Sequence, residues 1–103
     1  KFENDYWGGS LKELIYKSNL DFKQTVKLST CGAGAQLVKH YLKKRGNHNF
    51  KFVSAKDADY IIMTNRVTWN DKLVTCFNNF KGQTISKVER NGLTLSEIRK
   101  INN

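Results

Sequence analysis

The pattern of apolar and polar positions along the chain predicts two helices. Residues 10–13 read Ser-Leu-Lys-Glu, a capping box in which the serine and glutamate side chains bond free amides at a helix start. Leucine and isoleucine then recur at helical spacing, so a helix is predicted over about 11–18. A second helix is predicted over about 35–45. It ends at Gly46, because glycine readily takes the left-handed conformation that follows a helix.

Shorter runs of apolar residues predict the strands. The chain alternates apolar and polar residues, or is continuously apolar, over 25–30, 50–53, 60–65, 73–77, 84–90 and 93–99. The run at 60–63 is apolar without a break, which is typical of a strand covered on both faces. We therefore expect this strand in the centre of the sheet.

The last two predicted strands are joined by an Asn-Gly pair at 91–92, which favours a hairpin with a type I′ turn. A two-residue loop pairs Arg90 with Leu93 and, two residues further on, Val88 with Leu95. This register puts apolar side chains on both faces of the hairpin. Either both faces are covered or a β-bulge intervenes.

Together these elements predict a single two-layer α/β domain over residues 1–103, with two helices on a mixed sheet of about five strands. An α+β arrangement is the alternative. A chain that is 39% hydrophobic can build one such core. The side chains expected in that core are Leu11, Leu14, Ile15, Val26, Leu28, Leu37, Val38, Tyr41, Phe52, Tyr60, Ile61, Ile62, Val88 and Leu95.

The net charge of +9 favours an anionic neighbour, whether nucleic acid, a phospholipid surface or a phosphorylated ligand. Most basic residues are lysines, which suit bidentate recognition of phosphate or guanine less well than arginine. The chain is also rich in asparagine, and an AT-rich genome produces this composition without selection for binding. Basic side chains concentrate at Lys39, Lys43, Lys44 and Arg45, with apolar residues between them. This segment is either the solvated face of an amphipathic helix or a patch that faces lipid headgroups.

A glycine-containing turn joins the first predicted strand to the second predicted helix. Backbone amides and the helix dipole can hold a phosphate at such a place. The turn lacks the third glycine of a dinucleotide fingerprint and the Gly-Lys-Ser/Thr of a P-loop, so a plain tight connection is the simpler interpretation. If an anion binds this domain, the expected site comprises this turn and the polar residues near it, which are Gly32, Ala33, Gly34, Lys56, Asn65 and Arg66.

Cys31 and Cys76 are too far apart in the sequence for CxxC redox chemistry. They are either two reduced thiols or one disulfide, and an oxidising compartment favours the disulfide. Since His40 and His48 are the only other soft ligands, no metal site is expected.

The sequence offers no clear set of catalytic groups. Asp57 and Asp59 lead the predicted central strand, and paired carboxylates can perform acid–base chemistry. A polar turn is the simpler interpretation of this pair. Because no nucleophile, base and acid stand out together, neither a catalytic residue nor a cofactor is assigned.

Three segments carry a resemblance to a known family. The chain begins KFENDYWGGSLKEL, continues through a βα unit to ADYIIMTNR, and ends with a hairpin over ERNGLTLSEIRKI. In this order the segments resemble the soluble C-terminal domain that follows the last membrane span of some bacterial polytopic glycosyltransferases. These enzymes are similar to dolichyl-phosphate-mannose protein mannosyltransferases and aminoarabinose transferases. The resemblance covers residues 2–101.

The resemblance implies a domain cut from the end of a longer membrane protein and located on the extracytoplasmic side of the cell membrane. It implies that the catalytic acidic residues lie in loops between membrane helices, so none is carried over to this chain. The partners it implies are the membrane portion of the same chain and an anionic lipid surface or a polyprenyl-phosphate-linked sugar. The isolated domain is then a non-catalytic accessory domain, and the parent protein is the glycosyltransferase.

Tyr6 and Trp7 have two main interpretations. They can pack ahead of the capped helix as a hydrophobic staple. If a membrane helix precedes them, as the resemblance implies, they can instead lie at headgroup depth, as interfacial aromatic residues do. Stacking on a sugar is a third interpretation.

Two other classes of function stay open. A free-standing nucleic-acid-binding module would fit the charge, although the chain lacks an RNA-binding aromatic signature and a helix-turn-helix pattern. A small α/β protein that binds a phosphorylated ligand would fit the βα turn.

Overall fold

The computed structural model describes residues 2–18, 20, 23–32, 34–64, 66–67, 73–74, 80–90 and 92–101, with backbone alone for 2–9, 66–67, 73–74 and 93. The secondary structure is, in chain order, α1 (Phe2–Lys17), β1 (Val26–Cys31), α2 (Ala35–Lys44), β2 (Phe50–Phe52), the 3₁₀ turn η1 (Ala55–Asp57), β3 (Tyr60–Thr64), β4 (Arg66–Val67), β5 (Leu73–Val74), β6 (Gln83–Arg90) and β7 (Leu93–Lys100). In the described part of the chain, no helix has both the length and the apolar character to cross a bilayer.

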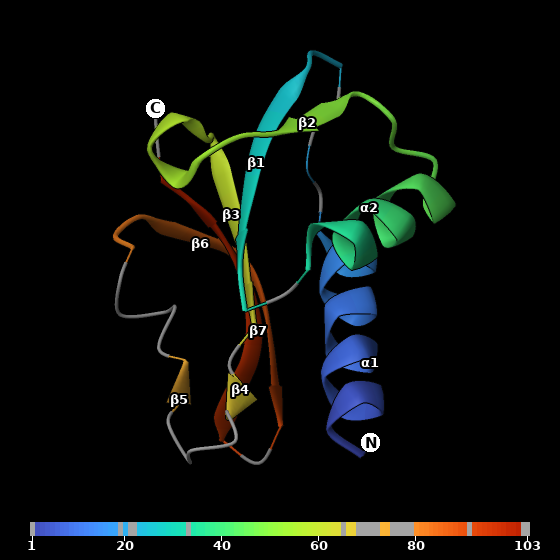
Figure 1. Cartoon of the computed structure of the whole chain (residues 1–103), viewed down its shortest axis with the longest axis vertical. Coiled ribbons are helices and arrows are strands. Elements are labelled where there is room, and N and C mark those ends of the chain that lie inside the picture. Colours follow the sequence, from blue (N-terminus) through green and yellow to red (C-terminus); the bar gives the residue numbers. More distant parts are fainter. Residues whose placement is uncertain are drawn as a thin grey trace.

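Five of the strands form one mixed sheet in the order β2-β1-β3-β7-β6 (Figure 1). β1 pairs in parallel with β2 and β3, and the hairpin β6–β7 adds to β3 in antiparallel orientation. The predicted α/β fold, with two helices and a mixed five-stranded sheet, is therefore confirmed. The apolar strand β3 is the middle strand, as its unbroken run predicts.

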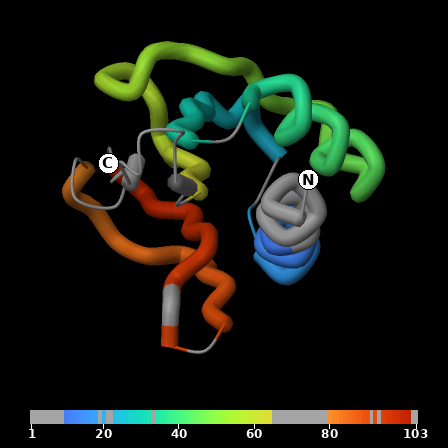
Figure 2. Tube along the Cα trace, turned by 60° about the horizontal axis from the view of Figure 1, so that its bottom comes forward, coloured from blue at the N-terminus to red at the C-terminus, as the bar shows by residue number. Residues whose placement is uncertain are grey.

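Both helices cover one face of this sheet, and Figure 1 shows α2 lying across the end of α1 that is farther from the N-terminus. Figure 2 looks nearly along α1, which lies beside the sheet. The main core lies between the helices and the sheet, where the buried side chains are Leu11, Leu14, Ile15, Val26, Leu28, Val38, Leu42, Ile62, Val88 and Ile98. The opposite face carries a smaller cluster around Ile61 and Met63, against which Ala55 and Phe80 pack. Since β3 has apolar cover on both faces, an alternating pattern would not have suited it.

The predicted start of α1 is wrong. The helix begins at Phe2, and Ser10 lies inside it with only 3% of its surface exposed. Instead of capping the helix, the Ser10 hydroxyl forms a 2.6 Å hydrogen bond with the Ser96 hydroxyl on β7. Tyr6 and Trp7 lie within the helix rather than ahead of it, so the staple interpretation is also wrong, and their side chains lie outside the described residues.

Two register shifts in the pairing of β6 with β7 determine which of their side chains face the helices. Arg90 pairs with Leu93, as predicted, but Val88 pairs with Ser96 instead of Leu95, because the register shifts between Val88 and Glu89. A second shift lies near the start of β6. Of the two alternatives that the sequence leaves open, the structure shows the irregularity in the register, and the sheet also has apolar clusters on both faces; the shift lets Val88 and Ile98 face the helices together. Asn91 lies outside the described residues.

Other core and strand predictions need correction. Leu37 is 39% exposed because it lies on the first turn of α2, away from the side that faces the sheet. Tyr41, Phe52 and Tyr60 are partly buried and pack against the core. The strand predicted at 73–77 is described only as β5, which pairs with β4 outside the main sheet, and residues 75–77 lie outside the described residues. Buried residues that the prediction missed are Leu42, Ala58, Met63 and Ile98.

Candidate functional site

The turn after β1 packs directly against the end of β3. Gly32 has a φ of +83°, and a Cβ added there would lie 2.3 Å from the Thr64 carbonyl oxygen. A side chain would therefore meet both backbone strain and a steric clash. Gly34 differs, because a Cβ added there would meet nothing within 4 Å. Ala33 and Asn65 lie outside the described residues.

The predicted anion-binding residues do not all come together. Gly32 lies beside Thr64, so the ends of β1 and β3 meet, as the prediction requires. Lys56 lies in η1, which leads into the start of β3. That start is level with Leu28, four residues before Gly32, or roughly 13 Å along the strand. Because β2 has only three residues and ends level with Leu28, the chain enters η1 near that end of the sheet, and Lys56 is separated from the turn. Arg66 begins β4, and its side chain lies outside the described residues.

The outer surface of α2 carries the basic residues that the sequence singles out. Lys39, Lys43 and Lys44 are exposed, while Val38 and Leu42 are buried on the opposite side of the helix. Arg45 takes a different role. Its Nη1 donates to the Ile15 carbonyl oxygen at 2.9 Å and to the Ser18 hydroxyl at 3.4 Å. The guanidinium thus satisfies a carbonyl at the C-terminal end of α1, where positive charge is favourable.

The charge of the chain is segregated along the sequence. Residues 22–56 contain eight lysines and arginines and no acidic residue, whereas the remaining residues contain ten basic and nine acidic ones. The acid-free stretch includes β1, α2 and β2, which lie together at one edge of the sheet (Figure 1). Residues 22–56 therefore carry eight of the nine net positive charges, although Asp59 at the start of β3 places a carboxylate against the Lys27 amide of β1.

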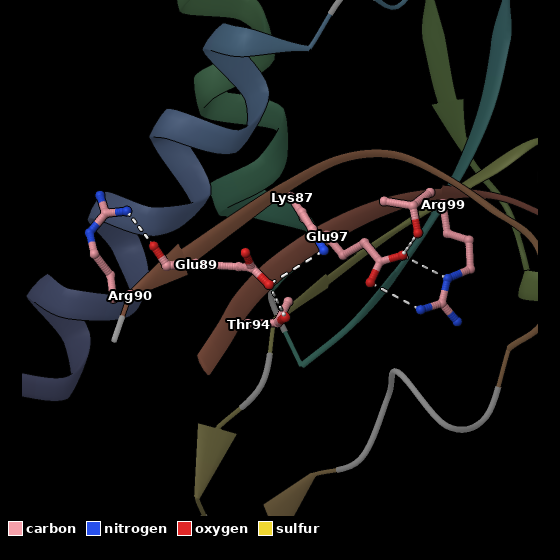
Figure 3. A network of polar contacts seen from close by, with 7 residues as sticks. Lys87, Glu89, Arg90, Thr94, Glu97 and Arg99 are labelled. Carbon is pink, nitrogen blue, oxygen red and sulfur yellow. Dashed lines mark hydrogen bonds and ion pairs between the residues drawn. The ribbon is translucent and has the colours of Figure 1, made fainter. Parts of the chain in front are cut away.

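A polar cluster on β6 and β7 was missed by the sequence reasoning. Glu97 is 5% exposed and forms a two-pronged ion pair with Arg99, whose Nε and Nη2 donate at 2.9 and 3.0 Å (Figure 3). The Thr84 hydroxyl donates to the same carboxylate at 2.6 Å, and Arg99 also donates to the Phe80 carbonyl oxygen. The only signal in the sequence is a pair of opposite charges two residues apart on one strand.

This cluster has a structural role. Three donors converge on the Glu97 carboxylate, and Arg99 divides its donors between that carboxylate and a backbone carbonyl. These groups therefore find their partners within the hairpin and the segment before it. The cluster joins the hairpin to the segment that leads into it.

The paired carboxylates at the start of β3 also have local partners. Asp57 accepts a hydrogen bond from the Ser54 hydroxyl at 3.1 Å, and Asp59 accepts one from the Lys27 amide at 3.2 Å. Their structural interpretation is supported. Across the described ranges, no three His, Cys, Asp or Glu side chains gather in a way that could hold a metal ion.

Cys31 ends β1 and packs against the smaller core cluster. It is engaged in a disulfide bond. Cys76, the other cysteine of the sequence, lies outside the described residues, so the pairing of the two stays a prediction.

Comparison with known protein families, with curated proteins and with solved structures found no match to this chain.

Proposed function

We propose that this chain is a non-catalytic accessory domain of a membrane glycosyltransferase that uses polyprenyl-phosphate-linked sugars. The domain acts at the extracytoplasmic surface of the cell membrane, where it supports the handling of the donor or the acceptor. The type of parent enzyme rests on the resemblance of the three sequence segments described above. The membrane portion of the parent chain then carries the chemistry.

The structural observation that best supports this proposal is the disulfide at Cys31. Stable disulfides belong to oxidising compartments, and cytosolic proteins rarely keep them. The described polar clusters also agree with a non-catalytic role, because the carboxylates of Glu97, Asp57 and Asp59 are engaged in local contacts.

The proposal is tested on the native protein in its source cells with an antibody raised against this domain. The expected result is a product several times heavier than 11.9 kDa that fractionates with membranes. A soluble product close to 11.9 kDa would refute the proposal and favour a free-standing binding protein.

The compartment has its own test. Peptide mapping of the native protein without reduction should recover Cys31 linked to Cys76. If the chain-entropy model holds, reducing a disulfide that closes so long a loop lowers the free energy of unfolding by about 4 kcal/mol. Recovery of both cysteines as free thiols from freshly isolated protein would contradict the extracytoplasmic assignment.

A further inference from the structure

The outer side of α2 presents a group of exposed basic side chains. Lys39, His40, Lys43 and Lys44 are exposed and are called the basic face here. In the part of the chain that the structure describes, none of the three lysines takes part in an ion pair. Residues 22–56 contain no carboxylate, so no acidic residue stands close to α2 in the sequence. The face is therefore available to an anionic partner.

The basic face offers ammonium groups rather than guanidinium groups. The nearby Arg45 is turned toward the end of α1, where it bonds the Ile15 carbonyl. An ammonium is a point charge that does not require a planar partner of matched geometry. Sequence-specific nucleic-acid recognition relies on arginine forks, and single strands are bound on aromatic platforms. A convex helix with three lysines instead suits an extended array of anionic headgroups.

An exposed apolar side chain lies beside one end of the basic face, next to His40 and Lys44. Leu37, His40 and Lys44 are spaced i, i+3 and i+7, so they share one side of α2. Leu37 is 39% exposed and is among the few large apolar side chains that the described residues leave at the surface. Helices that lie in a membrane interface combine apolar and basic side chains in this way.

From this arrangement we infer that the basic face of α2 docks on a bilayer that contains anionic phospholipids. The inference rests on the proposed function, because a patch of three lysines is weak alone and is useful to a domain already held at a membrane. Each lysine near an anionic surface contributes about a fivefold gain in binding, so three contribute about a hundredfold.

The test uses the purified chain and two kinds of vesicle, one of phosphatidylcholine alone and one of phosphatidylcholine mixed with phosphatidylglycerol, at low salt. The unchanged chain should partition to the mixed vesicles and not to phosphatidylcholine. The triple variant Lys39→Gln, Lys43→Gln and Lys44→Gln should lose about a hundredfold in partition coefficient. Leu37→Ser should lose a few-fold, because a partly exposed leucine contributes only part of its transfer free energy.

A matched control separates this face from net charge. Lys12, Lys81 and Lys100 are exposed and lie on α1 and the hairpin side of the molecule. Changing all three to glutamine lowers the charge by the same amount and should reduce partition far less than the α2 variant does. Circular dichroism should show both triple variants folded, because all six side chains are exposed.

Three outcomes would overturn the inference. The two triple variants could lose vesicle partition equally, or the unchanged chain could fail to partition to the anionic vesicles. Alternatively, the chain could bind a short DNA as tightly as the vesicles, with the same loss in the α2 variant. These outcomes decide the docking face and do not decide the proposed function. A heavy, membrane-bound native product combined with no vesicle binding would refute only the docking face.

Discussion

Removing one partner of the buried ion pair between Glu97 and Arg99 should strongly destabilise the hairpin. The two side chains are 7% and 13% exposed, whereas the ion pair between Glu13 and Arg90 has side chains that are 42% and 48% exposed. Water screens the exposed pair and does little to stabilise a charge left behind in the buried one. The cost of breaking a buried ion pair can therefore be compared with the cost of breaking an exposed one in the same molecule.

Changing Glu97 to leucine leaves the Arg99 guanidinium without its carboxylate in a nearly buried position. The expected loss in the free energy of unfolding is about 3 kcal/mol. For a domain of this size, that loss lowers the melting temperature by about 15 °C. Changing Glu13 to leucine should cost less than about 1 kcal/mol, because that pair is solvated.

The decisive variant changes Glu97 and Arg99 to leucine together. This variant removes both charges. The main hydrogen bond that it leaves unreplaced is the one from Arg99 to the Phe80 carbonyl oxygen. The double variant should therefore be more stable than either single variant, since apolar residues often replace a buried ion pair at little cost. Urea unfolding followed by circular dichroism gives the four free energies of the cycle. The reasoning fails if the single variants lose less than about 1 kcal/mol, or if the double variant loses the sum of both.

Two further predictions concern backbone contacts and use the same unfolding assay. Gly32→Ala should destabilise the chain by more than about 2 kcal/mol, because its φ is +83° and its Cβ would meet the Thr64 carbonyl, while Gly34→Ala should change stability by less than about 0.5 kcal/mol. Equal effects at both glycines would contradict the close approach of the turn to β3. Arg45→Met should cost about 1 kcal/mol and speed hydrogen exchange in the last turn of α1, since the bond to the Ile15 carbonyl is lost. Unchanged exchange there would show that Arg45 does not stabilise that end.

The elements that the sequence predicts well are those with a strong local pattern. The apolar run of β3 indicates its central place, and an Asn-Gly pair indicates the hairpin. On α2 the pattern succeeds only in part, because Val38 is buried as expected while Leu37 is exposed and the buried Leu42 was not in the expected core. In the first two cases, the residues that decide the structure are close together in the chain.

The predictions fail where a partner far along the chain decides the outcome. Ser10 has the residues of a capping box around it, yet its hydroxyl bonds Ser96, 86 residues away, inside a continuous helix. The pairing of Glu97 with Arg99 depends on β7 having a covered second face, and the pattern of charges alone does not show this cover. Local propensity is a weak guide when tertiary contacts satisfy the same groups in another way.

The use of arginine and lysine in this fold bears on whether the charge is functional. The three arginines with described side chains, Arg45, Arg90 and Arg99, all bond groups within the domain. The lysines of α2 have no such use and remain at the surface. A drift in base composition raises lysine along the whole chain, but it does not remove acidic residues from the single stretch 22–56. This segregation of charge is consistent with the anionic surface proposed as the partner of α2.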